Sequence, residues 1–353
     1  MPSTLAGDWS PRNRHLLETL LRTTGPGNYA VFDWDNTCVF LDVEEATLIY
    51  QLEEMAFAAE PDQMAAALRQ QLPHDDEAVT AHLFDLDQAY RWLWPRYNSL
   101  LGRGRREAIQ GSPEQHAFRA KFLHLYSHLE HHHGPEIAYP WMPFRFAGMT
   151  AQQVQGVTKA AVRWQLGQPI ETVTWSCPDK GKAGAVEISW RNGLRLLPEM
   201  QSLHRALAAA GIDVWVCTAS FVEGIRELAS NPEFGYGLNP ECVIGLRLAS
   251  DENACYLAQR EGKSEITYAN GKTDAIRRLL LPRYGRGPIL VAGDSNGDAP
   301  MLRDFKDTRL GLVIDTDRPR ESPIGKLAEL ARQGHHRYLL QQRDEARGSW
   351  RAY

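Results

Sequence analysis

The stretch Tyr-Ala-Val-Phe-Asp-Trp-Asp-Asn-Thr, residues 29–37, decides the fold. Residues 29–32 form a short apolar run typical of a buried strand, and the run ends abruptly in Asp33 and Asp35. Two carboxylates two positions apart can face one site where the chain leaves strand geometry. One can act as a nucleophile, because carboxylates form aspartyl-phosphates, and the other can act as general acid and then as general base.

Later apolar runs predict further strands of the same sheet. A helix is expected over residues 198–210, because Pro198 suits the first turn of a helix and Gly211 suits its end. Helical segments separate the runs that follow, so the pattern predicts an α/β fold with a parallel sheet. These runs lie at residues 212–217, 242–246, 289–292 and 310–314.

A long insertion separates the first strand from the later ones. Residues 44–170 are helical in pattern and rich in Gln, Glu, Ala, Leu and aromatic residues. Residues 171–190 alternate between apolar and polar side chains, and the Asn192-Gly193 turn follows them, so a β-hairpin is expected here.

The domain organisation follows from this insertion. We predict a discontinuous core formed by residues 1–43 and 190–353. The inserted domain, residues 44–189, is expected to be mainly helical, with the hairpin at its end.

Polar side chains follow the later strands, as they follow the first. Thr218 and Ala219 come directly after the run at residues 212–217. A hydroxyl and the following backbone amides suit an anion, so we predict that Thr218 and Ala219 bind a phosphate group, with Ser220 as a rival for the hydroxyl. Because the carboxyl ends of parallel strands converge on one crevice, these groups are expected near Asp33.

A lysine and two aspartates complete the set. Lys272 lies in Asn-Gly-Lys-Thr-Asp, residues 270–274, and would neutralise both the nucleophile and the phosphoryl oxygens. Asp294 and Asp298 lie in Gly-Asp-Ser-Asn-Gly-Asp, residues 293–298, directly after the third of the later runs. Hard carboxylate oxygens suit Mg²⁺, which keeps several waters and bridges to a phosphate.

The order of these motifs resembles that of the haloacid dehalogenase-like hydrolases, in their phosphatase branch. The resemblance rests on DxDxT, a strand ending in Thr, a lysine and GDxxGD. It implies a Rossmann-like core with an inserted cap domain, and Mg²⁺ as the cofactor. Asp35 argues against dehalogenation, because dehalogenases lack the second aspartate.

The same resemblance implies a role for each matched residue. By this resemblance, Asp33 is the nucleophile and Asp35 is the general acid and base. Thr218 binds phosphate, and Lys272 neutralises charge. The metal is held by Asp33, by Asp294 and by the backbone carbonyl of Asp35, while Asp298 is either a further ligand or a group that supports the ligands.

Looser similarities indicate a subgroup. Residues 33–37, 198–200 and 339–350 resemble phosphoserine-phosphatase-like and phosphorylcholine phosphatases. They imply a small-molecule phosphate ester, phosphorylcholine-like, as the substrate. A phosphoserine-type phosphatase is the alternative, in which Arg96 or Arg145 would meet the substrate carboxylate. A catalytically inactive binding protein on the same fold is a further alternative, against which the complete set of charged motif residues argues.

Aromatic residues are dense in the insertion. Core packing is their ordinary explanation, but a proline-punctuated stretch at residues 139–144 also suits a substrate wall. Aromatic faces would bind a quaternary ammonium group. We expect two or more of the following residues to face Asp33: Trp92, Trp94, Tyr97, Tyr139 and Trp141.

Two other features of the insertion attract attention. Asp85 and Asp87 form a second DxD, which is interpreted as a solvated helix face. His124 and His128 are spaced as a metal pair on a helix, within a cluster that continues at residues 131–133. The run is hydrophilic and lacks an HExxH order, so a solvated helix end is expected instead.

Composition excludes several classes of protein. With 353 residues, a net charge of -5 and 43 % hydrophobic residues, a globular protein with one large or two medium domains is expected. The mildly acidic balance gives no basis for nucleic-acid binding, and no apolar run reaches the roughly 18 residues of a membrane span. Residues 1–30 lack the apolar core of a signal peptide, so the cytoplasm is the expected location.

Overall fold

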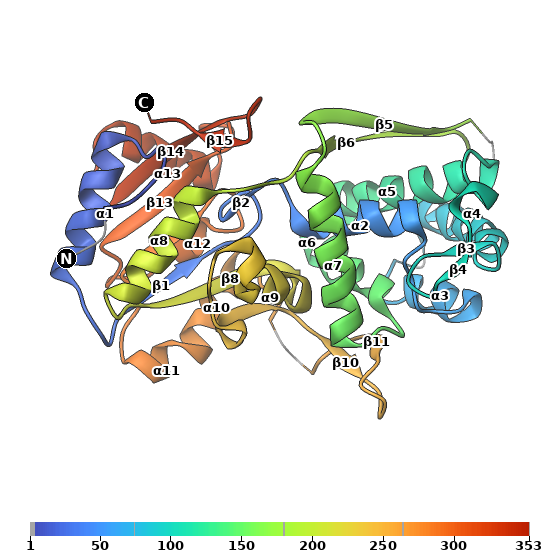
Figure 1. Ribbon diagram of the computed structural model, residues 1–353, viewed down its shortest axis with the longest axis horizontal. Coiled ribbons are helices and arrows are strands. Elements are labelled where there is room, and N and C mark those ends of the chain that lie inside the picture. The colour runs from blue at the N-terminus through green and yellow to red at the C-terminus, as the bar shows by residue number, and fades with distance from the viewer. Residues whose placement is uncertain (1–3, 74, 179–180, 263–264, 353) are drawn as a thin grey trace. The chain divides into compact units, whose positions relative to one another are not determined.

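The computed structural model describes residues 4–73, 75–178, 181–262 and 265–352. The chain forms two compact units, whose elements are labelled in Figure 1. The first unit comprises Met1–Val43, Gly193–Gly245 and Glu265–Tyr353, and the second comprises Glu44–Asn192 and Leu246–Ser264.

The first unit is built around a seven-stranded sheet with the strand order β15-β14-β13-β12-β1-β8-β9. Figure 1 labels β1, β8, β13, β14 and β15 of this sheet. The pairs from β14 to β8 are parallel, whereas β15 is antiparallel to β14. The α/β fold with a mainly parallel sheet is therefore confirmed, and β14 and β15 extend the sheet beyond the predicted strands. The strands are β1 (Tyr29–Phe32), β8 (Asp213–Phe221), β9 (Val243–Leu246), β12 (Leu290–Gly293), β13 (Leu310–Asp315), β14 (Tyr338–Asp344) and β15 (Ser349–Trp350).

Both faces of this sheet are covered. Val31 belongs to a buried cluster on one face with Ile276 and Leu302, whereas the ring of Phe32 lies 4.6 Å from that of His204 on the other. Burial on both faces explains why β1 is a continuous apolar run. The helices of this unit are α1 (Pro11–Thr23), α8 (Pro198–Ala209), α9 (Val222–Ser230), α10 (Asn270–Leu279), α11 (Leu281–Tyr284), α12 (Ala299–Arg303) and α13 (Pro323–Arg332).

The second unit is mainly helical. Strands β5 (Glu171–Cys177) and β6 (Val186–Asn192) pair antiparallel within it, from Glu171 with Asn192 to Cys177 with Val186. Among the described residues, no helix is both long and apolar enough to cross a membrane. The helices are α2 (Val43–Glu54), α3 (Pro61–Leu68), α4 (Glu77–Leu93), α5 (Pro113–His133), α6 (Pro135–Trp141) and α7 (Ala151–Leu166).

A second excursion of the chain also belongs to this unit, although the sequence analysis placed it in the core. Strands β10 (Leu248–Ser250) and β11 (Tyr256–Arg260) pair antiparallel. The amide of Tyr256 donates to the carbonyl of Met149, and the amide of Gly148 donates to the carbonyl of Tyr256, both at 2.8 Å. These bonds join residues more than a hundred positions apart, and local sequence pattern carries no signal for such a pairing.

Candidate active site

Asp33 directly follows β1, at the end of the sheet where β12 and β8 flank that strand. Its amide still donates to the carbonyl of Ala292 at 3.0 Å, as the next rung of the parallel ladder. The chain then turns, and Asn36 adopts a positive φ of 59°, a conformation that Asn tolerates better than most residues. Arg343 holds this turn by donating to both oxygens of Asn36, at 3.3 and 3.1 Å.

The carboxylate of Asp33 is buried and held at both oxygens. Lys272 Nζ donates to its Oδ1 at 2.5 Å, and Thr37 Oγ1 donates to its Oδ2 at 3.1 Å. Burial and the charge of Asp298 raise the pKa of Asp33 to about 7, although Lys272 acts in the opposite direction. A further cation at this position would favour the ionised, nucleophilic form.

Lys272 bridges two carboxylates from the first turn of α10. Its Nζ donates to Asp298 Oδ1 at 2.7 Å as well as to Asp33. Burial alone would lower the pKa of Lys272, but Asp298 and Asp33 raise it above its usual range, so the ammonium stays charged. A Cβ at the preceding residue, Gly271, would lie 1.8 Å from the carbonyl oxygen of Ile266, so this approach requires glycine.

Asp298 shapes the loop after β12. Its Oδ2 accepts the amides of Asp294 and Ser295 at 3.1 and 2.9 Å, and the Ser295 hydroxyl at 2.9 Å. A Cβ on Gly293 would lie 2.4 Å from the Cβ of Asp298, so glycine is needed at this close contact. The loop brings Asp294 Oδ1 to 3.4 Å from Thr37 Oγ1, the hydroxyl that also contacts Asp33.

The donor set fits a hard divalent cation. Oxygen atoms of the buried residues Asp33, Asp294 and Asp298 lie within 4.8 Å of one another. Burial and the two neighbouring carboxylates raise the pKa of Asp294 well above its usual range, although Arg318, 3.6 Å away and half-exposed, lowers it. Lys272 cannot balance three carboxylates alone, and buried charge is costly unless it is paired or bound to a metal. Carboxylate oxygens are the ligands that Mg²⁺ prefers.

Asp35 lies in a different environment. Its Oδ1 accepts the amide of Val43 at 2.7 Å, and its Oδ2 accepts the hydroxyl of Ser220 at 2.6 Å. Burial and the charge of Asp42 raise the pKa of Asp35 well above its usual range, although the Ser220 hydrogen bond lowers it. The raised pKa favours the protonated form of this carboxyl group, which is the form that a general acid needs.

Thr218 and Ser220 lie inside β8, which continues to Phe221 instead of ending at residue 217 as predicted. Thr218 Oγ1 accepts the amide of Ser220 at 3.1 Å, whereas the Ser220 hydroxyl donates to Asp35. Strand β9 packs closely here, because a Cβ on Gly245 would lie 2.8 Å from the Ser220 carbonyl oxygen and 3.1 Å from Thr218 Cγ2. Ala219, between the two hydroxyls, is partly exposed.

The five predicted substrate aromatics belong to the second unit and differ in exposure. Trp94 and Trp141 are buried, with 7 % and 1 % of their surface exposed. Trp141 Nε1 donates to the carbonyl of Leu68 at 2.9 Å, so this ring packs in the interior of the helical unit. Three of the rings are partly exposed, those of Trp92, Tyr97 and Tyr139.

The two arginines considered for a substrate carboxylate already have partners in the same unit. The guanidinium of Arg96 lies 3.9 Å from the ring centroid of Trp92 and donates to the Trp92 carbonyl at 2.6 Å. Arg145 is fully buried and donates to Gln51 Oε1 at 2.8 Å and to the carbonyl of Met142 at 2.7 Å. It also forms an ion pair with Glu44 at 3.1 Å.

The structure brings Asp33, Lys272, Asp294 and Asp298 into one cluster, with Asp35 bonded to Ser220 beside it. Sequence reasoning missed several residues that support this cluster. Thr37 was used only as a letter of its motif, although its hydroxyl contacts both Asp33 and Asp294. Thr316 and Arg318, which contact Asp294, follow β13, so the rule that ligands gather at strand ends would have found them.

Comparisons with known proteins show what the chain resembles. The family model of the haloacid dehalogenase-like hydrolases matches residues 175–303, which include Thr218, Lys272 and Asp294. The phosphorylcholine phosphatase of Pseudomonas aeruginosa is 26 % identical over 316 residues, covering 83 % of this chain and 76 % of that protein. A conserved functionally unknown protein from Anaerococcus prevotii is 27 % identical with a TM-score of 0.89, covering 100 % of this chain and 98 % of the other.

By these matches the chain is similar to the haloacid dehalogenase-like hydrolases, in their phosphatase branch. By the same matches it is a phosphoric monoester hydrolase. A divalent metal ion is the general cofactor of such phosphatases, and the three buried carboxylates fit that requirement.

Proposed function

We propose that this phosphatase hydrolyses a small phosphate monoester through an aspartyl-phosphate on Asp33, with Mg²⁺ as the metal. The observation that carries the proposal is the placement of Asp33 between Lys272 and Thr37, at 2.5 and 3.1 Å, inside a cluster with surplus negative charge. A structural ion pair would not need this excess of buried carboxylates, whereas a site that binds a cation and a phosphoryl group would use it.

In the first step, a carboxylate oxygen of Asp33 attacks phosphorus while the bond from phosphorus to the ester oxygen breaks. Asp35 gives its proton to that leaving oxygen, for which its raised pKa suits it. In the second step, Asp35 takes a proton from a water molecule that attacks phosphorus, and Asp33 leaves as a free carboxylate. Thr218, the amide of Ala219 and Lys272 bind the phosphoryl oxygens.

The metal ligands that we propose are Asp33, Asp294 and the backbone carbonyl of Asp35. Bound Mg²⁺ would neutralise phosphoryl charge. Asp298 already accepts four hydrogen bonds, three at Oδ2 and one at Oδ1, which favours a role in holding Lys272 and the loop over direct metal binding. Ser220 is bonded to Asp35, which favours Thr218 as the phosphate-binding hydroxyl.

Trapping the intermediate tests this chemistry. The protein is mixed with a phosphate ester and Mg²⁺, quenched in acid and analysed by peptide mass spectrometry. A phosphoryl group on the peptide that contains Asp33 is expected, with none in excess EDTA. Asp35→Asn should still accumulate the phosphorylated peptide, because its larger defect lies in hydrolysis. Full turnover in EDTA, or phosphorylation of another residue, would contradict the proposal.

For the substrate, we infer a phosphorylcholine-like ester with a cationic or apolar leaving group. The relative from Pseudomonas aeruginosa supports this, as do the partly exposed rings of Trp92, Tyr97 and Tyr139. The partners of Arg145 inside the second unit weigh against the phosphoserine alternative. Two cation–π contacts, each worth about 0.5–2 kcal/mol, would give a preference of about fivefold to several hundredfold over a neutral ester.

The comparison to make is kcat/KM for phosphorylcholine, phosphoethanolamine, phosphoserine and 3,3-dimethylbutyl phosphate. Tyr139→Ala and Tyr97→Ala should reduce the preference for the trimethylammonium ester, whereas Trp141→Ala should mainly destabilise the protein because its ring is buried. Equal kcat/KM for phosphorylcholine and for the neutral 3,3-dimethylbutyl phosphate would indicate an apolar pocket without cation–π recognition. Preference for phosphoserine would overturn the assignment.

A further inference from the structure

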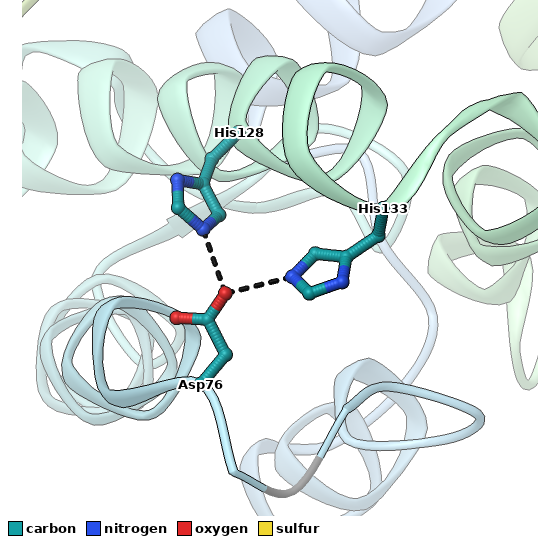
Figure 2. Close-up of side chains that lie close together, drawn as sticks. All are labelled: Asp76, His128 and His133. Carbon is teal, nitrogen blue, oxygen red and sulfur yellow. Dashed lines mark hydrogen bonds and ion pairs between the residues drawn. The ribbon is translucent and has the colours of Figure 1, made fainter.

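Three side chains from two helix ends in the second unit meet at one oxygen atom (Figure 2). His128 Nε2 donates to Asp76 Oδ2 at 2.9 Å, and His133 Nε2 donates to the same oxygen at 2.7 Å. Asp76 precedes α4, and both histidines lie in the last turns of α5. The prediction of a solvated helix end is therefore wrong for these two histidines, because a partner 52 and 57 residues earlier in the chain binds them.

The carboxylate is held in place from its other side. Asp76 caps α4, and its Oδ1 accepts the amides of Ala78 and Val79 at 2.8 and 3.1 Å. These bonds to a helix N-terminus fix the orientation of the carboxylate and leave Oδ2 directed at the imidazoles, as Figure 2 shows. Supporting hydrogen bonds of this kind orient the ligands of metal sites.

A second pair of histidines packs against the first. His82 Nδ1 donates to the carbonyl of Ala78 at 2.8 Å, so its Nε2 accepts from His124 Nδ1 at 2.9 Å. Burial lowers the pKa of both His82 and His124, which favours their neutral forms. The ring of His82 lies 6.5 Å from that of His128, so no fixed positive charge from this pair opposes a cation nearby.

We propose that Asp76, His128 and His133 bind a divalent transition-metal ion such as Zn²⁺. This site shares no residue with the carboxylate cluster of the first unit. Two imidazoles and one carboxylate are a ligand set that Zn²⁺ accepts, with water in the fourth position. Mg²⁺ prefers oxygen ligands, so the histidine site and the Asp33 site would select different ions.

The two distances from the histidines to Asp76 need little adjustment to bind an ion. With bonds of about 2.0–2.2 Å, the ligand atoms of a tetrahedral Zn²⁺ site lie about 3.4 Å apart, so the histidines would move back from Oδ2 by roughly half an ångström. All three side chains are 16–24 % exposed, which gives an ion access from solvent.

Metal binding requires that Nε2 of each histidine lose its hydrogen. In the structure, Nε2 of each histidine points its hydrogen at Asp76. On binding, a neutral ring loses its Nε2 proton to solvent and gains one at Nδ1, so that the Nε2 lone pair can bind the metal; a doubly protonated ring releases its Nε2 proton and keeps the one at Nδ1. The ion would tie the start of α4 to the end of α5.

Zn²⁺ titration of the full chain tests the site, with a colorimetric chelator as competitor and Mg²⁺ in excess. The titrations use an Asp294→Asn background, so that the carboxylate cluster contributes less Zn²⁺ binding. One equivalent of Zn²⁺ should bind. Adding His133→Ala should lower the Zn²⁺ affinity by at least about 100-fold, because loss of a residue that only supports a ligand lowers metal affinity by at most about that factor. His128→Gln provides an independent second variant, and circular dichroism checks the fold of each.

His131→Ala is the matched control, because His131 lies on the same helix end and bonds to the Ser127 carbonyl at 2.9 Å. It should bind Zn²⁺ as its parent does. Co²⁺ should give the same stoichiometry and an absorption spectrum of a four-coordinate ion, which His133→Ala abolishes. The proposal would be overturned if the parent protein bound no more Zn²⁺ than His133→Ala does. It would also be overturned if His131→Ala weakened Zn²⁺ binding as much as His133→Ala does.

Discussion

Two buried lysines, one in each unit, show opposite ways of placing charge in a protein interior. Lys121 in the second unit donates to Asp85 Oδ2 at 2.7 Å, and the same carboxylate accepts the amides of Lys182 and Ala183 at 2.9 and 2.8 Å. Lys272 in the first unit instead faces two carboxylates at 2.5 and 2.7 Å.

The difference lies in the charge balance. Burial would raise the pKa of Asp85, but the bonds from Lys121 and the backbone lower it, so the pair is complete as it stands. The cluster around Lys272 carries more carboxylates than cations, and the pKa values of Asp33 and Asp294 are raised. An ion pair whose charges cancel, such as Lys121 with Asp85, needs no ligand to maintain the fold. A buried cluster with excess negative charge, such as the one around Lys272, is suited to bind a cation.

The largest expected effect separates chemistry from structure. Asp33→Asn should lower phosphate release by at least about a thousandfold, because the amide is a poor nucleophile. Asp85→Asn lies in the other unit's balanced pair and should retain measurable turnover in whatever fraction stays folded. Near-normal turnover of Asp33→Asn on any substrate would show that Asp33 is not the nucleophile, and the contrast with Asp85 would not hold.

The second effect concerns stability. Asp85→Asn leaves Lys121 buried without a counter-charge and should destabilise the second unit by about 3–5 kcal/mol. Asp33→Asn removes surplus charge and leaves Lys272 paired with Asp298, so the metal-free protein should be as stable as the wild type or more stable. Denaturant unfolding in EDTA measures both variants. An equal loss in the two would show that the clusters do not differ.

The third effect is the dependence of metal stabilisation on pH. The pKa of Asp33 is about 7 in the folded protein, against about 4 in the unfolded chain. Between these values the folded state binds more protons, so the contribution of this group to metal-free stability falls as pH rises. Mg²⁺ should therefore raise the melting temperature by several degrees more at pH 8 than at pH 5. Asp33→Asn should flatten this difference.

The smallest effect concerns a third way to bury an ionisable group, which is to keep it neutral. Burial lowers the pKa of His204 to about 3, well below about 6.5 for an exposed histidine. Here the unfolded state binds the extra proton, so stability falls as pH drops from about 6.5, by at most about 1.4 kcal/mol per unit. His204→Gln should lessen this acid sensitivity in denaturant unfolding followed at several pH values. An unchanged slope would assign the sensitivity to other groups.

Local pattern located four strands of the sheet and the polar residues that follow two of them, but it missed β14 and β15. Apolar runs bounded by polar residues located β1, β9, β12 and β13, because strands buried on both faces leave that signature. Asp33 and Asp294 were predicted to lie close together because a parallel sheet gathers its strand ends, and the structure places them so. The end of β8 was misplaced, since the polar residues Thr218 and Ser220 lie inside the strand.

Long-range pairings set the limit of that reasoning. Asp85 was interpreted as a solvated residue, yet it is buried, because its partner Lys121 lies 36 residues later. The same limit hid the bonds of His128 and His133 to Asp76. Periodicity describes which face of a helix is apolar, but it does not identify the charged group that a distant helix brings to that face.

The chain enters the second unit twice, at Glu44–Asn192 and again at Leu246–Ser264. The second visit contributes β11, whose Tyr256 exchanges backbone hydrogen bonds with Gly148 and Met149. A graft that exchanges residues 44–192 between related phosphatases would therefore transplant half of a pairing and leave the other half in the recipient. Exchange of the second unit therefore needs two crossovers made together, and single-cassette chimaeras should yield insoluble or inactive chains.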